Sequence, residues 1–108
     1  MKSVRIAVAV LGVGCALCSP GGLFAQAEDA AARNIAAGCS ACHGTNGASV
    51  SQLPSLAGAP RADIVTKLQE FKSGKRPGTV MPQLAKGYTD EQIDRAAAWF
   101  AAQPAPAK

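Results

Sequence analysis

Two cysteines and a histidine stand together in the stretch Cys39-Ser40-Ala41-Cys42-His43. Cys-x-x-Cys-His is the attachment signature of c-type haem, because each thiol can bond to a vinyl group of the macrocycle while the adjoining imidazole binds the iron. We therefore predict one covalent haem c per chain, attached through Cys39 and Cys42, with His43 as an iron ligand. The alternatives are a disulfide between the two cysteines, a zinc site, or a surface position for the imidazole. A structural zinc site needs four Cys or His ligands, and the chain after residue 27 supplies three.

The second axial ligand is predicted from what the chain can supply. His43 is the only histidine, and Met81 is the only methionine after Met1. Methionine commonly accompanies histidine on haem iron, so we expect Met81 to bind. A loop methionine also serves as a gap-filler in a core, which is the alternative. With both positions filled, the iron would exchange single electrons. A haem enzyme or gas sensor with an open position is therefore less favoured.

The first 27 residues have the features of a secretory leader. A basic start precedes thirteen residues, Ile6–Cys18, that are apolar apart from glycine, and Ala25-Gln26-Ala27 fits a cleavage site. A membrane span needs about 20 apolar residues, so we expect no stable membrane anchor. Cleavage there would remove Cys15 and Cys18 and leave one domain at 28–108. We expect that domain to be periplasmic.

A domain of this size has a marginal core and usually needs a metal, a disulfide or a bound cofactor. Residues 28–108 carry nine Lys and Arg against seven Asp and Glu, a net charge of +2. This is far from the basic footprint of a nucleic-acid-binding domain, so we expect no nucleic-acid partner. The cluster Lys72, Lys75 and Arg76 could meet an acidic partner, although a solvated helix end is the favoured interpretation.

The expected elements are helices and long loops. Helices are predicted at 30–38, 61–73 and 90–102. Apolar residues recur at helical spacing in the second, and Thr89 with Gln92 fits a capping box before the third. Segments 44–59 and 75–88 are rich in glycine and proline and are predicted to be loops, and no segment alternates like a strand. We therefore expect an all-α fold of three main helices wrapped around a large apolar ligand.

The surroundings of the iron are predicted in less detail. The carbonyl that accepts the imidazole N–H of His43 is expected within Leu53-Pro54-Ser55-Leu56, because metal-binding histidines usually have such a partner. Candidates for the apolar wall are Leu53, Leu56, Ile64, Leu68, Phe71 and Leu84. Candidates for contacts to propionates or the ring edge are Tyr88, Lys86, Arg76 and Trp99, for which ordinary packing is an equal explanation.

Taken together, the motifs resemble those of the small class I bacterial c-type cytochromes. The matching segments are Cys39–Gly44, Leu53–Gly58, Leu68–Arg76, Val80–Pro82 and Ala96–Ala101. Their order is similar to single-haem units of dihaem periplasmic cytochromes. It also resembles the haem subunit of flavocytochrome c sulfide dehydrogenase, toward which residues 81–91 lean.

This resemblance implies a compact helical fold whose first and last helices cross near the haem edge. It implies thioethers at Cys39 and Cys42, His43 and Met81 as iron ligands, and Pro54 as the residue whose carbonyl orients the imidazole. It further implies a periplasmic electron-transfer protein. That protein would be either a haem subunit taking electrons from a flavoprotein dehydrogenase, or a free soluble carrier to a terminal oxidase or another cytochrome.

One departure from the family pattern lies in the last helix. The chain has Trp99 between Ala98 and Phe100, where these families commonly show tyrosine. The ring remains aromatic, so we expect the helix crossing to be kept.

Overall fold

The computed structural model describes residues 21–107, with side chains described from Ala30 onward. Its elements are α1 (Gly21–His43), the 3-10 turn η1 (Thr45–Gly47), α2 (Arg61–Ser73), α3 (Met81–Lys86) and α4 (Asp90–Ala101). No strand occurs between residues 21 and 107, which confirms the all-α class. The predicted leader, 1–27, lies outside the described residues up to position 20. From Gly21 the backbone is already part of α1.

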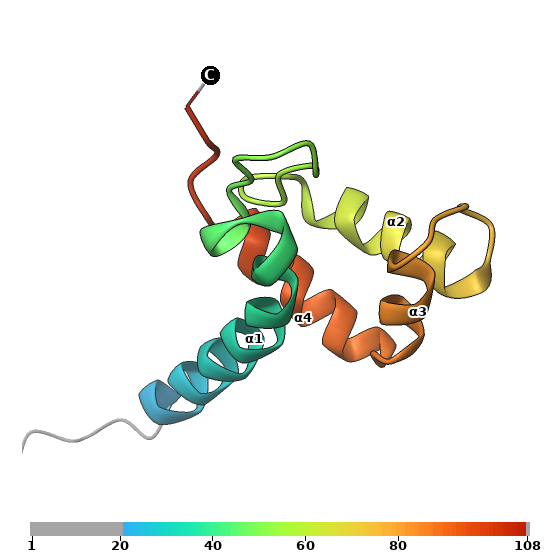
Figure 1. The fold of residues 1–108 in the computed structure, drawn as a ribbon. Helices are drawn as coiled ribbons and strands as arrows, with labels where there is room; N and C mark the ends of the chain where they lie inside the picture. Colours follow the sequence, from blue (N-terminus) through green and yellow to red (C-terminus); the bar gives the residue numbers. More distant parts are fainter. Residues whose placement is uncertain (1–20, 108) are drawn as a thin grey trace, which may run out of the picture.

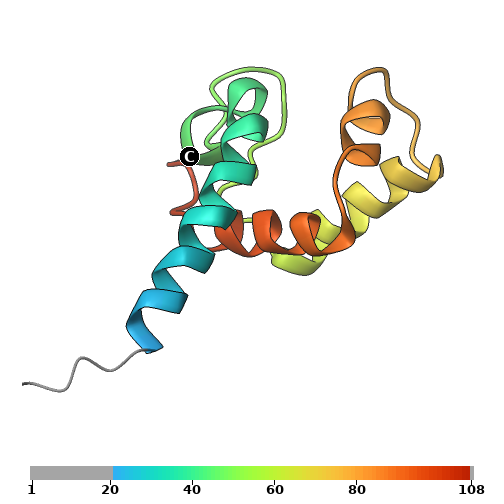
Figure 2. The same cartoon turned by 90° about the horizontal axis from the view of Figure 1, so that it is seen from below.

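The helices pack in a chain of pairs: α1 on α4, α4 on α2, and α2 on α3 (Figure 1). The expected contact between the first and last helices is therefore present. Figure 2 shows that α2 and α4 form a layer, and that the C-terminal part of α1 and the whole of α3 rise from the same side of it at its two ends. Within residues 21–107, α1 and α3 do not form a packed pair.

The first helix is longer than predicted. We expected 30–38 with a turn or a close packing contact at Gly38, but α1 continues through the Cys-x-x-Cys-His motif to His43. Gly38 stays helical and serves close packing, because a Cβ there would lie 3.2 Å from the Tyr88 hydroxyl. The helix ends at Gly44, whose φ of 86° is unfavourable for other residues and where a Cβ would overlap the carbonyl of Ala48.

The second and last helices match their predictions closely. α2 has the predicted bounds and ends at Gly74 in the left-handed conformation (φ 80°). At the start of α4 the Gln92 N–H donates to Thr89 Oγ1 (3.1 Å) and the Thr89 N–H donates to Gln92 Oε1 (2.9 Å), which forms the predicted capping box. α4 ends at Ala101, one residue earlier than predicted.

The loop prediction for 75–88 was wrong over Met81–Lys86, which forms α3. Proline near the start of a helix costs no hydrogen bond, and Gln, Leu, Ala and Lys after Pro82 all favour helix. The proline was therefore a helix-start signal rather than a loop signal. The long loop 44–59 likewise contains a short turn, η1, that the sequence did not predict.

The buried core is small for the length of the chain. Its apolar members are Ala36, Ala57, Ile64, Ala85, Ile93, Ala96, Ala97 and Phe100. Five of these are alanines, and Phe100 and Ile93 are the largest fully buried side chains. Trp99 meets Phe100 edge to face at 5.1 Å, so the unusual tryptophan keeps an aromatic contact at the α1–α4 crossing. A core made mainly of alanine buries little apolar area, which makes a bound macrocycle energetically important.

Candidate functional site

The last turns of α1 bring Cys39, Cys42 and His43 to one side of the helix, because residues three and four apart are neighbours on a helix surface. Both thiols are free. Cys42 is exposed, and Cys39 is half-buried against the core. Burial raises the pKa of the Cys39 thiol above its ordinary value; a backbone hydrogen bond opposes this and the nearby Cys42 adds to it. The two sulfurs thus share a face with the imidazole.

The imidazole of His43 is buried and held in one tautomer. Its Nδ1 lies 2.7 Å from the carbonyl oxygen of Pro54, and the residue is 7 % exposed. A carbonyl only accepts, so Nδ1 carries the proton and donates it, which leaves the Nε2 lone pair free for a metal. Among the described residues no fully buried side-chain nitrogen or oxygen lacks a partner, so Nε2 opens on accessible space.

The carbonyl of Pro54 is itself fixed by a network in the loop after α1. The Gly47 carbonyl accepts the N–H groups of Leu56 (2.8 Å) and Ala57 (3.1 Å), and the Ser49 N–H donates to Ser55 Oγ (2.9 Å). A Cβ at Gly47 would lie 2.6 Å from a ring carbon of Phe100, so this glycine allows the loop to pack directly on α4. The loop therefore presents its carbonyl to His43 from a rigid base.

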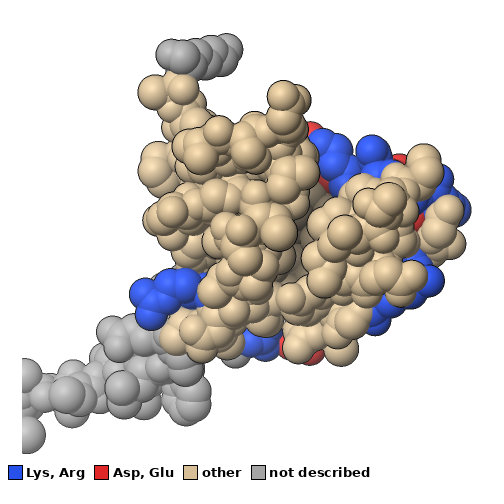
Figure 3. All heavy atoms as spheres, viewed as in Figure 1, with Lys and Arg blue, Asp and Glu red and all other residues tan. Residues whose placement is uncertain are grey.

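Met81 is the first residue of α3 and is half-buried. α3 packs on α2, at the opposite end of the layer from the end of α1 that carries His43. Figure 3 shows a crevice on the side from which the C-terminal part of α1 and α3 rise, lying between the two. The structure thus places the two predicted iron ligands on elements that border this crevice. That both bind one iron remains a prediction.

Large apolar side chains are exposed beside the predicted ligands. Leu53 precedes Pro54 and is 45 % exposed, while Val80 and Leu84 flank Met81 and are 59 % and 48 % exposed. Exposed apolar residues thus stand next to Pro54, the partner of His43, and on both sequence sides of Met81. Leu53 and Leu84 were predicted for the haem wall. Val80, which was not among the predicted wall residues, is a further exposed apolar side chain next to Met81.

The other wall candidates are buried or half-buried. Ile64 is buried in a cluster with Ala36, Ala97 and Phe100, against which Leu56 and Leu68 also pack. Phe71 carries the guanidinium of Arg76 over its ring. Their role as haem wall stays a prediction.

The candidates for propionate contacts differ in the contacts that they make within the protein. Arg76 Nε donates to Glu70 Oε2 at 2.8 Å. Tyr88 lies with its hydroxyl near Gly38, and Lys86 is exposed. In the basic cluster of Lys72, Lys75 and Arg76, Lys72 is likewise engaged by the protein. It donates to the Tyr88 carbonyl (2.8 Å) and pairs with Asp90 (2.7 Å), so the cluster is not simply a solvated helix end.

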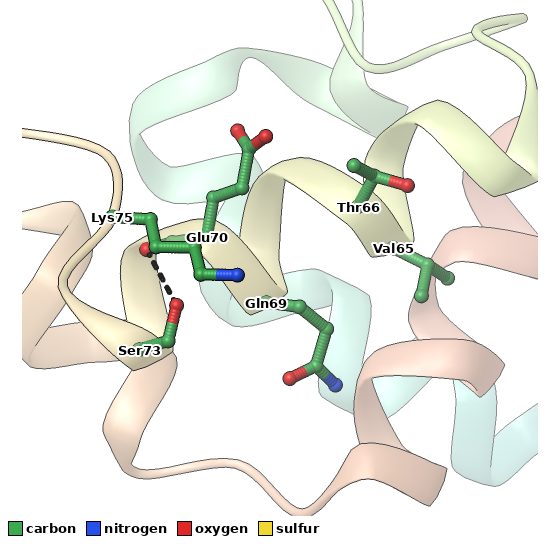
Figure 4. A pocket seen from close by; sticks show the side chains of 6 residues that line it. All are labelled: Val65, Thr66, Gln69, Glu70, Ser73 and Lys75. Atoms are coloured by element: carbon green, nitrogen blue, oxygen red, sulfur yellow. Dashed lines mark hydrogen bonds between the residues drawn. The ribbon is translucent and has the colours of Figure 1, made fainter.

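A separate hollow lies on the outer side of α2 (Figure 4). It is lined by Val65, Thr66, Gln69, Glu70, Ser73 and Lys75. The Ser73 hydroxyl donates to the Glu70 carbonyl at 3.3 Å, which closes the end of the helix rather than a ligand site. None of the five predicted haem-binding residues lines it.

The described part of the chain offers neither a clustered metal site nor a membrane span. No group of three or more His, Cys, Asp or Glu side chains between residues 21 and 107 is placed to hold a metal ion, so that range offers no support for the zinc alternative. No helix there is both long and apolar enough to cross a membrane.

Comparison with known proteins gives consistent matches. The family model described as cytochrome c oxidase, cbb3-type, subunit III, matches residues 26–100. The cytochrome subunit of sulfide dehydrogenase from Chlorobaculum tepidum is 48 % identical over 62 residues, covering 57 % of this chain and 56 % of that protein. Cytochrome c4 from Pseudomonas aeruginosa is 38 % identical over 84 residues, covering 76 % of this chain and 42 % of that protein.

Cytochrome c-554(548) from Halomonas halodenitrificans is 34 % identical over 82 residues, covering 71 % of this chain and 99 % of that protein. The chain therefore spans about half the length of the first two relatives and nearly all of the third.

Proposed function

The chain belongs to the class I c-type cytochromes, in the family described as cytochrome c oxidase, cbb3-type, subunit III, and its cofactor is covalently bound haem c; on this premise we propose that it is a single-haem electron carrier with His43 and Met81 as the two axial ligands. The observation that carries the proposal is the 2.7 Å contact from His43 Nδ1 to the Pro54 carbonyl. It fixes the tautomer whose other nitrogen binds metal.

The residues of the crevice fit this cofactor. Cys39 and Cys42 offer two thiols on the face of α1 that carries His43. The core is alanine-rich and leaves large apolar groups exposed beside the site. Haem c, when bound, supplies an iron that cycles between the ferric and ferrous states. With a histidine nitrogen and a neutral thioether on the iron, the ferrous state is favoured and no position stays open for oxygen or peroxide.

We place this carrier in the periplasm, because residues 1–27 have the features of a secretory leader and thioether attachment uses exported cysteines. Its partners are redox proteins. The 48 % identity to a cytochrome subunit of sulfide dehydrogenase supports a haem subunit that accepts electrons from a flavoprotein dehydrogenase. The match over 99 % of cytochrome c-554(548), which is not named as a subunit, supports the alternative of a free carrier.

The ligand set is tested on the purified holoprotein. A haem stain after denaturing electrophoresis should be positive, and the reduced protein should show a sharp low-spin spectrum and resist carbon monoxide. Met81→Ala should keep the stain but bind carbon monoxide readily, whereas Gln83→Ala, an exposed neighbour on α3, should behave as the parent. Ready carbon monoxide binding by the parent would show that Met81 is not a ligand.

The partner is tested separately in the native host. Purification through a tag on this chain should bring down a flavin-containing protein in stoichiometric amount if the chain is a dehydrogenase subunit. Isolation of the chain by itself, with full electron-transfer competence toward a second cytochrome, would favour the free carrier.

A further inference from the structure

The segment between α2 and α3, residues 75–80, leads directly into Met81 and is neither helix nor strand. Three contacts from one residue tie it to the end of α2. The Arg76 N–H donates to the Glu70 carbonyl (3.1 Å), Arg76 Nε donates to Glu70 Oε2 (2.8 Å), and the guanidinium lies 5.5 Å from the centre of the Phe71 ring. Arg76 thus contacts two neighbouring residues of α2: it binds Glu70 through a backbone hydrogen bond and an ion pair, and Phe71 through a cation–π contact.

The same ring carries the contact forward to the methionine. A Cβ at Gly78 would lie 3.2 Å from Phe71 Cε1 and 3.1 Å from Pro82 Cδ, so the backbone of Gly78 passes tightly between the two rings. Pro82 is the residue after Met81. A continuous line of packed groups therefore runs from Arg76 through Phe71 and Gly78 to the residue beside the proposed ligand.

We propose that Arg76 is a positioning residue for the axial methionine: by holding residues 75–80 against α2, it keeps Met81 on the iron and slows its replacement by other ligands. This inference rests on the proposed ligation by Met81. Replacement requires the methionine segment to swing away, so contacts that hold the segment in place raise the barrier to exchange. The matched control is Lys75, the adjacent cation, which is exposed and lines the same hollow as Glu70 (Figure 4) but makes no ion pair or ring contact among the described residues.

The experiment measures how fast imidazole displaces the native ligand in ferric holoprotein. An ion pair that is 40 % and 36 % exposed and a ring contact together justify a rise of about 5- to 10-fold in that rate for Arg76→Met. Lys75→Met removes the same charge and should stay within about twofold of the parent, as expected for an exposed surface cation. The sulfur-to-iron charge-transfer band of the ferric protein should weaken in Arg76→Met alone.

Two further variants distinguish the loss of the Arg76 contacts from a general misfolding of the protein. Arg76→Lys keeps the charge but loses the planar fork and the ring stacking, so its rate should lie between those of the parent and Arg76→Met. Glu70→Gln should give a smaller rise, and combining it with Arg76→Met should add little, because both remove one interaction.

The outcomes separate this inference from the function it builds on. If Met81→Ala leaves the exchange rate and the charge-transfer band unchanged, the methionine ligation itself is wrong. If Met81→Ala abolishes the band but Arg76→Met and Arg76→Lys exchange no faster than Lys75→Met, the ligation stands and the positioning role of Arg76 is overturned.

Discussion

His43 ends a helix of 23 residues, whereas Met81 begins a helix of six. The histidine side is built from neighbours in sequence: both cysteines lie within four residues of it, and its carbonyl partner, Pro54, is eleven residues away. The methionine side depends on contacts made across elements, since the segment before it is fastened to α2 by Arg76. The histidine side chain is therefore held directly by a hydrogen bond of its own, whereas Met81 is held through the segments that carry it.

This difference indicates where the site opens. On the histidine side, the helix, the covalent attachment and the burial of the imidazole, which is 7 % exposed, resist displacement of His43 from the iron. A half-buried methionine behind a segment held partly by a solvent-exposed ion pair resists it less. Ligand exchange is therefore expected on the methionine side.

The largest effect should come from deleting each ligand in turn. His43→Ala should lower the yield of haem-loaded protein by more than about tenfold, since even losing an outer partner of a metal ligand costs about 10- to 100-fold in metal affinity. Met81→Ala should retain covalent haem and gain carbon monoxide binding. Both are measured by haem stain and by the spectrum of the reduced protein. Equal loss of haem in the two variants would contradict the asymmetry.

The next largest effects are expected from replacing one glycine near each ligand, Gly44 after His43 and Gly78 before Met81. Gly44→Ala forces a left-handed residue and an overlap with the Ala48 backbone, for an expected cost of about 3 kcal/mol in the free energy of unfolding. Gly78→Ala meets Pro82 and Phe71 at 3.1 and 3.2 Å, where the neighbours can shift, for about 1 kcal/mol. Only the second change should speed imidazole binding.

Gly74→Ala is the control for strain without crowding. Gly74 has a φ of 80°, and a Cβ added there would meet nothing within 4 Å, so the change should cost about 1 kcal/mol. Urea unfolding of the three holoproteins gives the comparison. A cost at Gly44 no greater than at Gly74 would show that the turn after His43 is not tightly constrained.

Residue patterns with one structural meaning could be predicted from the sequence, and contacts with many available partners could not. The Cys39–His43 motif, the bounds of α2 and the capping box at Thr89 are set by residues within a few positions of one another, and all were predictable as patterns. α3 was missed because proline was counted as a loop former when it began a helix. The engagement of Arg76 with Glu70 and Phe71 had no sequence signal, since a cation near a helix end has many available partners.

Some supporting residues of the histidine side were also missed. Gly44 directly follows the motif, and that position was a usable signal because a helix ending at the ligand needs a residue tolerant of positive φ. Ser55 had no comparable signal, since its hydroxyl acts on the N–H of Ser49 across a loop.

A smaller effect is expected from loosening the loop that carries Pro54. Ser55→Ala removes the acceptor of the Ser49 N–H at a half-buried position, which should lower the free energy of unfolding by about 1 kcal/mol. Ser51→Ala, whose bonds in the same loop are exposed and 3.2–3.3 Å long, should cost less. Urea unfolding of the ferrous holoprotein measures both. Equal costs would mean that the loop is not anchored through Ser55.

The smallest effect concerns two exposed carboxylates that tie α2 to α4. Hydrogen bonds from Gln69 (3.0 Å) and then Lys72 (2.7 Å) hold the pKa of Asp90 below its ordinary value of 3.8. A hydrogen bond from Arg61 lowers the pKa of Asp94 in the same way. Because the folded pKa lies below the unfolded one, this stabilisation is complete above the unfolded pKa and is lost as pH falls through the folded value.

Acid should therefore weaken both ties, but only slightly, because the side chains of Asp90 and Asp94 are 75 % and 46 % exposed and solvent screens them. Asp90→Asn and Asp94→Asn should each flatten the fall in urea midpoint between neutral pH and about pH 3. Lys72 pairs with Asp90 and also donates to the Tyr88 carbonyl, which follows α3. Asp90→Asn should therefore also speed imidazole exchange at neutral pH, and its difference from the parent should vanish as acid protonates Asp90 in the parent, whereas the Asp94 variant should show no such difference. Equal exchange rates in the two would place the Asp90 network outside the methionine side.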